Sequence, residues 1–295
     1  MFEIVKREEL AQNIVLTNVH APRIAKSAKP GQFVIVRVGE KGERIPLTIS
    51  DYNREEGWIT LVTQIVGDSS KKICAVPEGG SFADVVGPLG HPSEFVYENI
   101  DDLKNKNILF IAGGLGTAPV YPQVKWLHEQ GAPADVIVGA KTKDLLIFQD
   151  EMKAVAKNLY IATDDGSEGF HGLVTDLMKD LIDNQGKKYD VVVAIGPMIM
   201  MKFVALATKP YGIKTIVSLN SLMVDGTGMC GACRVKVGER IYFTCVDGPE
   251  FDGHQVDYDE AMRRQNMYKS LDSRIAKMEK ERAEGHKCKV GLDKE

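Results

Sequence analysis

The sequence predicts a protein of the β + α/β class, with an N-terminal antiparallel β-barrel, a doubly wound parallel-sheet domain and a C-terminal loop that contains cysteines. Two observations predict the two domains. Up to about residue 100, short alternating or apolar runs are separated by Gly, Pro, Asn and charged turns, which favours a small barrel. After a polar connection at 100–107, buried strand-like runs alternate with segments of helical spacing, which is typical of a doubly wound domain.

Length, charge and hydropathy limit the other classes. A chain of 295 residues exceeds what one hydrophobic core usually organises, so about two domains are expected. The formal net charge is −4 and no basic patch is interleaved with aromatics, which argues against nucleic acid as a partner. No apolar run reaches the roughly 18 residues of a membrane span, and the first residues lack the apolar core of a signal peptide. We therefore expect a cytoplasmic protein without a membrane segment.

In the first domain, strands are expected at residues 32–38 and 58–66. Between them, the segment 44–48 (Arg-Ile-Pro-Leu-Thr) places a cation, a rigid residue and a hydroxyl within one strand length. Arg44 can hold a diphosphate through paired charge-assisted hydrogen bonds, and Thr48 can face the edge of a flavin ring. The segment therefore favours a flavin site on the barrel.

A second phosphate-type signal follows in the same domain. Residues 67–70 (Gly-Asp-Ser-Ser) form a loop before a helix that is expected to start at 71–73, and such a helix start suits a pyrophosphate. Considered without the other domains, the two segments favour a structural interpretation, in which Arg44 is a solvated strand residue and Ser70 is a helix N-cap.

The second domain shows its elements as alternating segments. Strands are expected at 108–112, 136–138, 159–162 and 190–195, and helices at 119–130, 148–156 and 173–182. The glycine-rich segment 113–117 follows the first strand and opens a helix, so its backbone can close on a pyrophosphate; a tight structural turn is the alternative. Segments 163–167 and 194–198 end two further strands at the edge where open sheets bind ligands. Together they predict a nicotinamide site.

The choice between NADH and NADPH stays open in the sequence. No acidic residue lies at the usual distance after the glycine segment to bind the ribose. Lys141 and Lys143 favour a 2′-phosphate, but Asp144 follows directly.

The most specific motif of the chain begins at Asp225. Asp225, Cys230, Cys233 and the distant Cys245 match the plant-type ferredoxin spacing, with aspartate in place of the first thiolate. The glycines between them leave room for backbone N–H groups to approach the sulfides of a [2Fe–2S] cluster. A carboxylate can ligate iron, although it is a harder donor than thiolate.

Other interpretations of this motif remain open. A zinc site would use the three cysteines with Asp225 or His254, and a plain loop would bind nothing. Asp-Gly is also an ordinary turn, so a water, Cys74 or Cys288 could take the place of Asp225 as ligand.

The ordered set of motifs resembles the ferredoxin–NADP reductase superfamily. The set comprises Arg-x-Pro-Leu-Thr (44–48), Gly-x-x-Ser (67–70), Gly-Pro-Leu-Gly (87–90), Gly-Leu-Gly-Thr-Ala-Pro (114–119), Thr-Asp-Asp-Gly-Ser (163–167) and Gly-Pro-Met (196–198). With the cluster loop, the chain is similar to the electron-transfer subunits of dihydroorotate dehydrogenase. The aspartate at 225 and the charged C-terminal extension depart from that branch, and they resemble the small subunits of NADH-dependent ferredoxin:NADP oxidoreductases, also named sulfide dehydrogenase subunit beta.

This resemblance implies FAD in the barrel, NAD(H) on the α/β domain and a [2Fe–2S] cluster with one aspartate ligand. It implies an electron-transfer subunit of a flavin-based electron-bifurcating oxidoreductase, which forms a heterodimer with a large flavin and [4Fe–4S] subunit and reaches ferredoxin through it. The alternative is the electron-transfer subunit of an NAD-dependent dihydroorotate dehydrogenase. The expected path from nicotinamide through flavin and cluster to the partner requires no catalytic acid or base.

The resemblance also implies residue roles and boundaries. The flavin residues are Arg44, Pro46, Leu47, Thr48, Thr63, Gln64, Ile65, Val66, Gly67, Ser69 and Ser70. The nicotinamide residues are Gly113, Gly114, Gly116, Thr117, Asp165, Gly166, Gly196, Pro197 and Met198. The cluster ligands are Asp225, Cys230, Cys233 and Cys245. We expect an FAD domain at 1–100, an NAD(P) domain at 101–219, a cluster region at 220–256 and a charged arm at 257–295, with the partner docking on the cluster loop and the arm.

Overall fold

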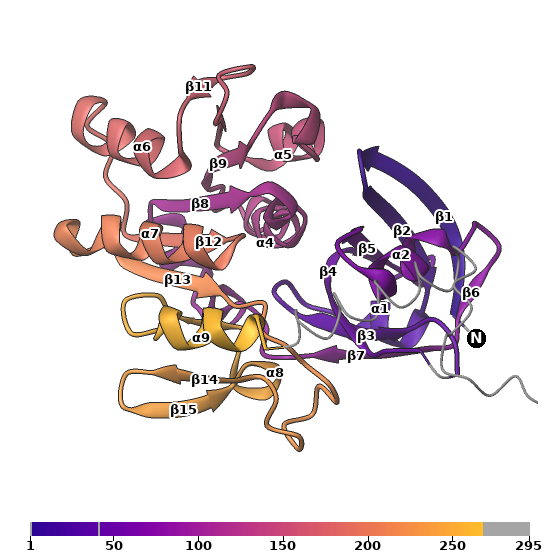
Figure 1. The fold of residues 1–295 in the computed structure, drawn as a ribbon. Helices are drawn as coiled ribbons and strands as arrows, with labels where there is room; N and C mark the ends of the chain where they lie inside the picture. Colours follow the sequence, from indigo (N-terminus) through magenta and orange to yellow (C-terminus); the bar gives the residue numbers. More distant parts are fainter. Residues whose placement is uncertain (1, 41, 268–295) are drawn as a thin grey trace, which may run out of the picture.

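The computed structural model describes residues 2–40 and 42–267, which form two seven-stranded sheets and a small hairpin (Figure 1). The first sheet has the order β6-β1-β2-β5-β4-β3-β7, and each neighbouring pair is antiparallel. It curls around one apolar core to form the predicted β-barrel. Its strands are β1 (Phe2–Ala11), β2 (Ile14–His20), β3 (Phe33–Arg37), β4 (Ile45–Asn53), β5 (Trp58–Gln64), β6 (Ser81–Phe82) and β7 (Asp84–Leu89).

The second sheet has the order β11-β10-β9-β8-β12-β13-β16. The strands from β11 to β13 are parallel, as predicted for a doubly wound domain. The apolar runs of its central strands are buried on both faces. Its strands are β8 (Ile108–Gly113), β9 (Asp135–Ala140), β10 (Asn158–Thr163), β11 (Phe170–His171), β12 (Val191–Ile195), β13 (Lys214–Ser218) and β16 (Glu250–Asp252). The hairpin consists of β14 (Arg234–Val237) and β15 (Arg240–Phe243).

Helices cover both faces of the second sheet (Figure 1). One core lies between the sheet and α6, α7 and α9, and the other lies between the sheet and α3, α4 and α5. The helices are α1 (Pro22–Ser27), α2 (Asp68–Ala75), α3 (Ile100–Lys104), α4 (Thr117–Glu129), α5 (Gln149–Val155), α6 (Val174–Lys179), α7 (Met198–Thr208), α8 (Thr244–Asp247) and α9 (Tyr258–Gln265). Among the described residues, no helix combines the length and apolarity that crossing a bilayer requires.

The start of α2 differs from the prediction. The helix begins at Asp68, three residues before the expected start, because the Ser70 hydroxyl caps it. Ser70 Oγ accepts hydrogen bonds from the backbone N–H groups of Val66 and Gly67, both at 2.9 Å. Ser70 is therefore a residue of the first turn whose side chain is already engaged.

The second sheet ends later in the chain than predicted. The expected end was near residue 219, but β16 adds an outer strand that is antiparallel to β13. The pairing joins Ile216 to Asp252 and Ser218 to Glu250. A three-residue strand carries too little periodicity to be recognised in a sequence. The cluster loop is therefore an excursion between two neighbouring strands of the nucleotide sheet.

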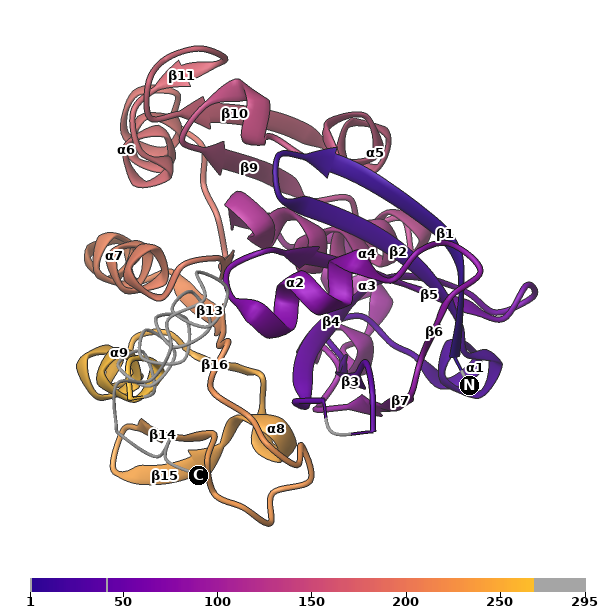
Figure 2. The ribbon, with the colours of Figure 1, turned by 45° about the vertical axis from the view of Figure 1, so that its right-hand side comes forward.

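The barrel and the α/β unit meet along α4, which packs against β4 (Figures 1 and 2). An ion pair crosses this junction: Lys125 Nζ on α4 lies 2.9 Å and 3.0 Å from the two carboxylate oxygens of Asp51 on β4. Because α4 begins at the glycine-rich segment, the junction fixes the predicted nucleotide turn relative to the predicted flavin strand.

Candidate redox-cofactor sites

The four predicted cluster ligands stand as two pairs. Cys230 Sγ lies 3.5 Å from Asp225 Oδ1, and Cys233 Sγ lies 3.3 Å from Cys245 Sγ. In the described part of the chain, no three His, Cys, Asp or Glu side chains converge on a position for one metal ion. A two-iron cluster takes two protein ligands on each iron, whereas zinc needs three or four around one ion. Two separate pairs therefore fit a [2Fe–2S] centre better than zinc.

The Asp225 carboxylate organises the first half of the loop. It accepts hydrogen bonds from the backbone N–H groups of Thr227 at 3.0 Å, Met229 at 3.1 Å and Cys230 at 3.1 Å. These bonds, that from Thr227 above all, hold the pKa of Asp225 below its usual range. Gly226 has a φ of +77°, which favours glycine. The Asp-Gly turn is thus present, and it keeps an anionic carboxylate beside Cys230.

The second pair is buried. Cys233 and Cys245 are each 1% exposed, and the Thr244 N–H donates to the Cys233 carbonyl at 3.1 Å. Burial above all, and the neighbouring Cys233 next, raise the pKa of the Cys245 thiol to about 12. Iron is bound by the deprotonated thiolates. The positive charge of a metal centre would stabilise both cysteines in this deprotonated form.

The alternative ligands lie elsewhere or are not described. His254 Nε2 lies 3.0 Å from Thr208 Oγ1 at the end of α7. Cys74 is buried in α2, where its thiol donates to the Thr63 carbonyl at 3.7 Å. Cys288 lies outside the described residues. Asp225 is therefore the carboxylate that the structure places beside the cysteines.

The predicted flavin residues lie on β4, at the end of β5 and at the start of α2, which are neighbouring elements. Thr48 is on β4, and Gln64, Ile65 and Val66 lead from β5 toward α2. The buried hydroxyl of Thr63 has no hydrogen-bond partner among the described residues, which is consistent with a bound polar group.

Two predicted phosphate-binding side chains are already engaged. Ser69 Oγ donates to the Glu43 carboxylate, and Ser70 caps α2. The backbone N–H groups at the start of α2 can bind an anion. The Ser69 hydroxyl can contribute to this site if its hydrogen bond to Glu43 is broken.

Arg44 is bonded differently from the expectation. Its Nε donates to the Val224 carbonyl at 3.1 Å and its Nη2 to the Asp225 carbonyl at 3.3 Å. Its Nη1 lies 3.5 Å from Asp84 Oδ2. Arg44 therefore ties the barrel to the cluster loop, a contact that spacing along the chain could not reveal.

The predicted nucleotide glycines lie where the turns after β8 and β12 pack together. A Cβ at Gly116 would stand 2.1 Å from the Ile195 carbonyl oxygen, and one at Gly113 would stand 2.3 Å from Met200 Sδ. Packing against backbone therefore requires glycine at 116, whereas at 113 the flexible Met200 side chain would have to move. Gly114 differs, because its φ is +55° and no heavy atom lies within 4 Å of a Cβ there. Its backbone is therefore the part of this turn that is open to a ligand.

The other nucleotide residues gather at the same sheet edge. Asp165 Oδ1 accepts from the Ser167 N–H at 3.0 Å and its hydroxyl at 2.6 Å, and these bonds lower the pKa of Asp165. The Lys143 N–H donates to Ser167 Oγ at 2.8 Å, so the turns after β9 and β10 are joined. Pro197 and Met198 begin α7, and Met198 is buried in its core.

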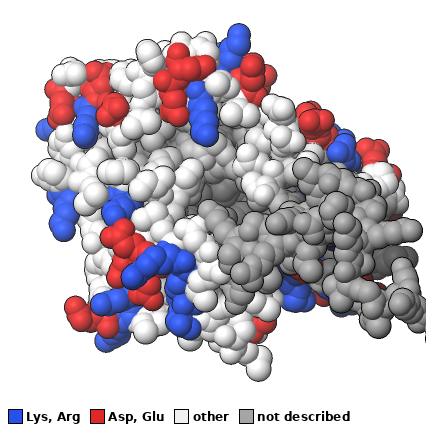
Figure 3. All heavy atoms as spheres, viewed as in Figure 1, with Lys and Arg blue, Asp and Glu red and all other residues white. Residues whose placement is uncertain are grey.

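A hollow of about 320 Å³ lies between the barrel rim and the cluster loop. Figure 3 shows one face of the molecule, on which acidic and basic side chains are intermixed along the edge and the described atoms at the middle are mostly uncharged. The sequence did not predict His91, whose N–H donates to the Gly248 carbonyl at 2.7 Å; the Gly-Pro-Leu-Gly motif directly before it was the available signal. The hollow is lined by Pro88, Leu89, Gly90, His91, Gly226, Thr227, Cys245 and Val246.

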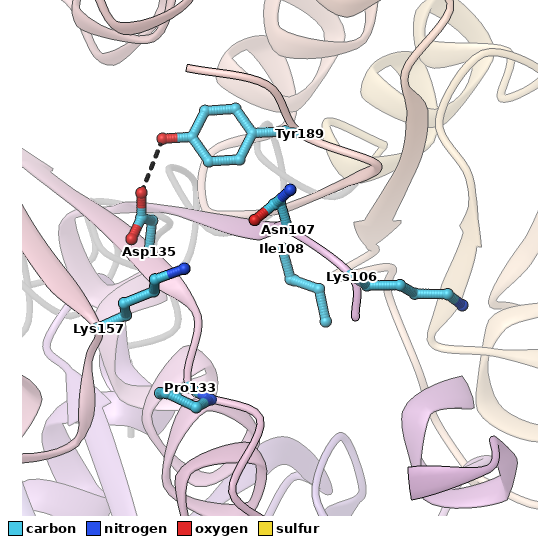
Figure 4. Close-up of a pocket in the computed structure, with 7 residues that line it drawn as sticks. All are labelled: Lys106, Asn107, Ile108, Pro133, Asp135, Lys157 and Tyr189. Atoms are coloured by element: carbon cyan, nitrogen blue, oxygen red, sulfur yellow. Dashed lines mark hydrogen bonds between the residues drawn. The ribbon is translucent and has the colours of Figure 1, made fainter. Parts of the chain in front are cut away.

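A smaller hollow of about 10 Å³ lies at the opposite edge of the α/β sheet (Figure 4). It has room for about one water. Asp135 accepts a hydrogen bond from the Tyr189 hydroxyl at 2.9 Å and lies 3.3 Å from Lys187 Nζ. The carboxylate of Asp135 is thus already paired, and the hollow is too small for a cofactor, so we assign it a structural role.

Known families match the α/β unit and the segment that contains the cysteines. Residues 110–206 match the oxidoreductase NAD-binding domain, and residues 220–257 match the iron–sulfur cluster binding domain of dihydroorotate dehydrogenase B. The dihydroorotate dehydrogenase B electron transfer subunit homolog of Thermotoga maritima is 47% identical over 270 residues, which is 92% of each chain. The chain belongs to this family of electron-transfer subunits.

Two further relatives extend the match over nearly the whole chain. A Clostridium beijerinckii protein, described as an uncharacterized protein in the adh 3′ region, is 58% identical over 97% of this chain and 96% of its own length. A solved structure described as the NADH-dependent reduced ferredoxin-NADP oxidoreductase, in a study of flavin-based electron bifurcation, is 44% identical with a TM-score of 0.86. The match covers 95% of this chain and 97% of that one.

Family membership gives the cofactors and the type of protein. The chain is an oxidoreductase subunit of the ferredoxin-reductase type, and its cofactors are FAD, a [2Fe–2S] cluster and NAD(H). Because its relatives are electron-transfer subunits, it works with a partner subunit.

Proposed function

We propose that this family member is the electron-transfer subunit of a flavin-based electron-bifurcating NADH-dependent ferredoxin:NADP oxidoreductase. The aspartate beside Cys230 carries the proposal, because an electron-transfer subunit of dihydroorotate dehydrogenase would have a cysteine at 225. The 44% identity over 95% of the chain to a protein of the proposed kind supports it. We place the protein in the cytoplasm, where its thiols stay reduced.

The partner in this proposal is a large flavin and [4Fe–4S] subunit that forms a heterodimer with the chain, and ferredoxin reacts through that partner. When bound, FAD supplies the exchange between the two-electron chemistry of nicotinamide and the one-electron chemistry of an iron–sulfur centre. The chain's own residues position these groups. Barrel residues from Arg44 to Ser70 hold the flavin, and turn residues from Gly113 to Met198 hold the nicotinamide.

The assignment of residues to domains belongs to the same proposal. We assign 1–100 to the FAD domain, 101–219 to the NAD domain and 220–256 to the cluster region. The strand β16 within 220–256 completes the nucleotide sheet, so the last two regions share one sheet. Of the proposed arm at 257–295, residues 257–267 form α9 and its flanks, and the rest lies outside the described residues.

We propose that the partner docks over the cluster loop, which presents exposed apolar side chains. Met229 is 88% exposed and Val224 50%, and Leu222 and Val246 are each 37% exposed. Apolar groups left in water around a redox centre favour burial against another protein. Docking there would bring the partner close to the exposed Cys230.

The experiment is anaerobic co-purification of the chain with its partner, followed by flavin, iron and acid-labile sulfide assays. We expect a coloured heterodimer that couples NADH and reduced ferredoxin to NADP+ reduction. A colourless protein, or one without labile sulfide, would contradict the proposal.

A second function has specific support. Relatives at 30–47% identity are described as dihydroorotate dehydrogenase B electron-transfer subunits or their homologue. The same purified complex distinguishes the two, because dihydroorotate-dependent reduction of NAD+ without ferredoxin would select the dihydroorotate dehydrogenase function.

A further inference from the structure

Three polar side chains meet at the junction of the barrel, α4 and β16: the buried Ser93 and Gln123, and the half-buried Glu250, whose Oε2 atom is buried. Gln123 Nε2 donates to Glu250 Oε1 at 2.7 Å, and the Ser93 hydroxyl lies beside the same carboxyl. Each of the three keeps one buried atom without a hydrogen-bond partner among the described residues: Ser93 Oγ, Gln123 Oε1 and Glu250 Oε2. A buried polar atom without a hydrogen-bond partner destabilises the folded state, so three such atoms in one place require an explanation.

These three polar side chains lie on or next to segments that also carry residues of the three proposed cofactor sites. Gln123 lies on α4, the helix that begins at the nucleotide turn. Glu250 begins β16, five residues after the proposed ligand Cys245, and the Leu219 N–H donates to the neighbouring Pro249 carbonyl at 2.9 Å. A Cβ at Gly31 would stand 3.3 Å from Glu250 Oε1, so the barrel closes the third side.

The barrel side leads directly to the proposed flavin strand. Gln32, which follows Gly31, accepts a hydrogen bond at its carbonyl from the Ile49 N–H at 3.0 Å. Ile49 is next to Thr48 on β4. Glu250 is thus linked through Gly31 and Gln32 to the strand that carries Thr48, and it is close in sequence to the proposed ligand Cys245.

A proton on Glu250 explains two of the orphan atoms together. A carboxylate offers acceptors and no donor, so Glu250 Oε2 and Gln123 Oε1 would both remain unpaired. A protonated carboxyl has one O–H donor, and an acid and a primary amide form a pair with two hydrogen bonds. The Gln123 amide already donates to one carboxyl oxygen, and the acid proton can return to the amide oxygen.

The charges around the carboxyl agree with this neutral form. Burial is the main cause that raises the pKa of Glu250 to about 7. The negative charge of Glu94 acts in the same direction, and the hydrogen bond from Gln123 opposes it. Glu94 is itself paired with Lys214 of β13. On α4, the Lys125 ammonium is paired with Asp51 and is not free to neutralise Glu250.

We propose that Glu250 is a proton-accepting site coupled to reduction of the chain's redox centres. The inference depends on the proposed function, because reduced nicotinamide is the electron donor in it. When one electron enters the neighbouring one-electron centre, one proton moves from a solvent hydronium ion to the Glu250 carboxylate. An O–H bond of hydronium breaks, leaving water, and an O–H bond forms at Glu250 Oε2. The added negative charge favours the acid form, and by reciprocity the acid form favours the reduced centre.

The test is a potentiometric titration of the cluster in the complete protein, followed by its EPR signal from about pH 5 to about pH 9. In the wild type we expect a reduction potential that is constant below about pH 7, where Glu250 is protonated in both states. Above that pH the reduction potential should fall by up to about 59 mV per pH unit. This is the shift that a tenfold change in proton concentration produces when one proton accompanies one electron. Glu250→Gln should remove the slope, and the matched control Glu94→Gln should keep it.

Infrared difference spectra between oxidised and dithionite-reduced protein give a second readout. We expect a carbonyl band of a protonated carboxyl that gains intensity on reduction, shifts in D₂O and is absent from Glu250→Gln. If that variant does not fold, the wild type still decides, because its slope and its band must both be present.

Three results would overturn the inference. A potential without pH dependence in the wild type, or an equal slope in Glu250→Gln, would exclude the coupling while leaving the proposed function intact. Absence of the carboxyl band at every pH would show that a bridging water satisfies the orphan atoms instead. A reduced wild type without a cluster signal would remove the proposed function and this inference together.

Discussion

Asp225 has two possible roles, as the first residue of a turn and as a ligand of the iron–sulfur cluster. Its three backbone hydrogen bonds make a stable turn, and any Asp-Gly sequence can form such a turn. The position of Cys230 Sγ, 3.5 Å from the same carboxylate, is not required by the turn. That contact is the structural reason to expect ligation.

Replacing Asp225 with Cys tests the ligand assignment. We expect the cluster to be retained, with a changed EPR spectrum and a shifted reduction potential, because thiolate is a softer ligand than carboxylate. The control Asp144→Cys adds a thiol at another exposed position and should leave both unchanged. An unaltered spectrum in Asp225→Cys would exclude coordination by the carboxylate.

Arg44 gives a second residue-scale prediction. Its guanidinium donates to two successive carbonyls of the cluster loop, a geometry that a lysine ammonium cannot reproduce. We expect Arg44→Lys to increase proteolytic cleavage within residues 220–232 and to lower flavin content. Arg37→Lys is the matched control, because Arg37 bonds carbonyls of its own turn. Equal cleavage in both variants would contradict the proposed tie.

Glu250 also makes folding stability depend on pH. Its pKa is raised from 4.5 to about 7 in the native state, so between these values the folded chain binds more protons than the unfolded chain. The contribution of Glu250 to the free energy of unfolding is therefore fully present below about pH 4.5. It is lost as the pH rises to about 7, which lowers the free energy of unfolding by about 3 kcal/mol. Denaturant titrations should show this decrease for the wild type and not for Glu250→Gln. A parallel decrease in both proteins would rule out Glu250 as its source.

At the scale of elements, the glycine turns combine packing with ligand access. Gly116→Ala would press a methyl against the Ile195 carbonyl at 2.1 Å, so we expect a markedly lower melting temperature. Gly114→Ala meets open space and costs about 1–2 kcal/mol of backbone strain. Its main effect should be weaker NADH binding, measured by titration of flavin reduction. Gly39→Ala is the neutral control, because Gly39 has neither a positive φ nor close neighbours and lies outside the proposed cofactor sites.

The elements show which parts of the fold a sequence can reveal. Long buried strands such as β8 and β12 were predicted within one or two residues, because apolar runs between polar turns specify them. The start of α2 was misplaced because Ser70 acts from inside the helix. The strand β16 was missed because β13, its partner, fixes it by pairing rather than by local pattern.

The sites divide in the same way. Spacing was sufficient to predict Asp225, Cys230, Cys233 and Cys245, which the structure brings together as two pairs. It could not predict that Arg44 reaches the cluster loop, since 180 residues separate it from Val224. The contact of Glu250 with Gln123 and Ser93 could not be predicted for the same reason, because the three residues come from separate parts of the chain.

At the scale of the whole molecule, the exposed apolar loop predicts where the partner binds. Met229→Glu should weaken association with the large subunit at least tenfold, because it places a charge in an interface that excludes water. Gel filtration and titration calorimetry of the two purified subunits would measure this. Leu173→Glu is the control, since this exposed leucine precedes α6, near the edge strand β11 and away from the cluster loop. Undiminished binding by Met229→Glu would move the interface elsewhere.

The position of β16 has a consequence for biosynthesis. During translation, β13 leaves the ribosome before Asp225 and β16 leaves it after Cys245, so the outer edge of β13 has no neighbour while the metal-binding segment is being made. A nascent or truncated chain that stops within this interval presents unpaired backbone groups, which recruit other strands and promote aggregation. In the finished protein both ends of that segment are anchored on one strand. A chain that has lost its metal can therefore keep the segment in place for reloading without unfolding.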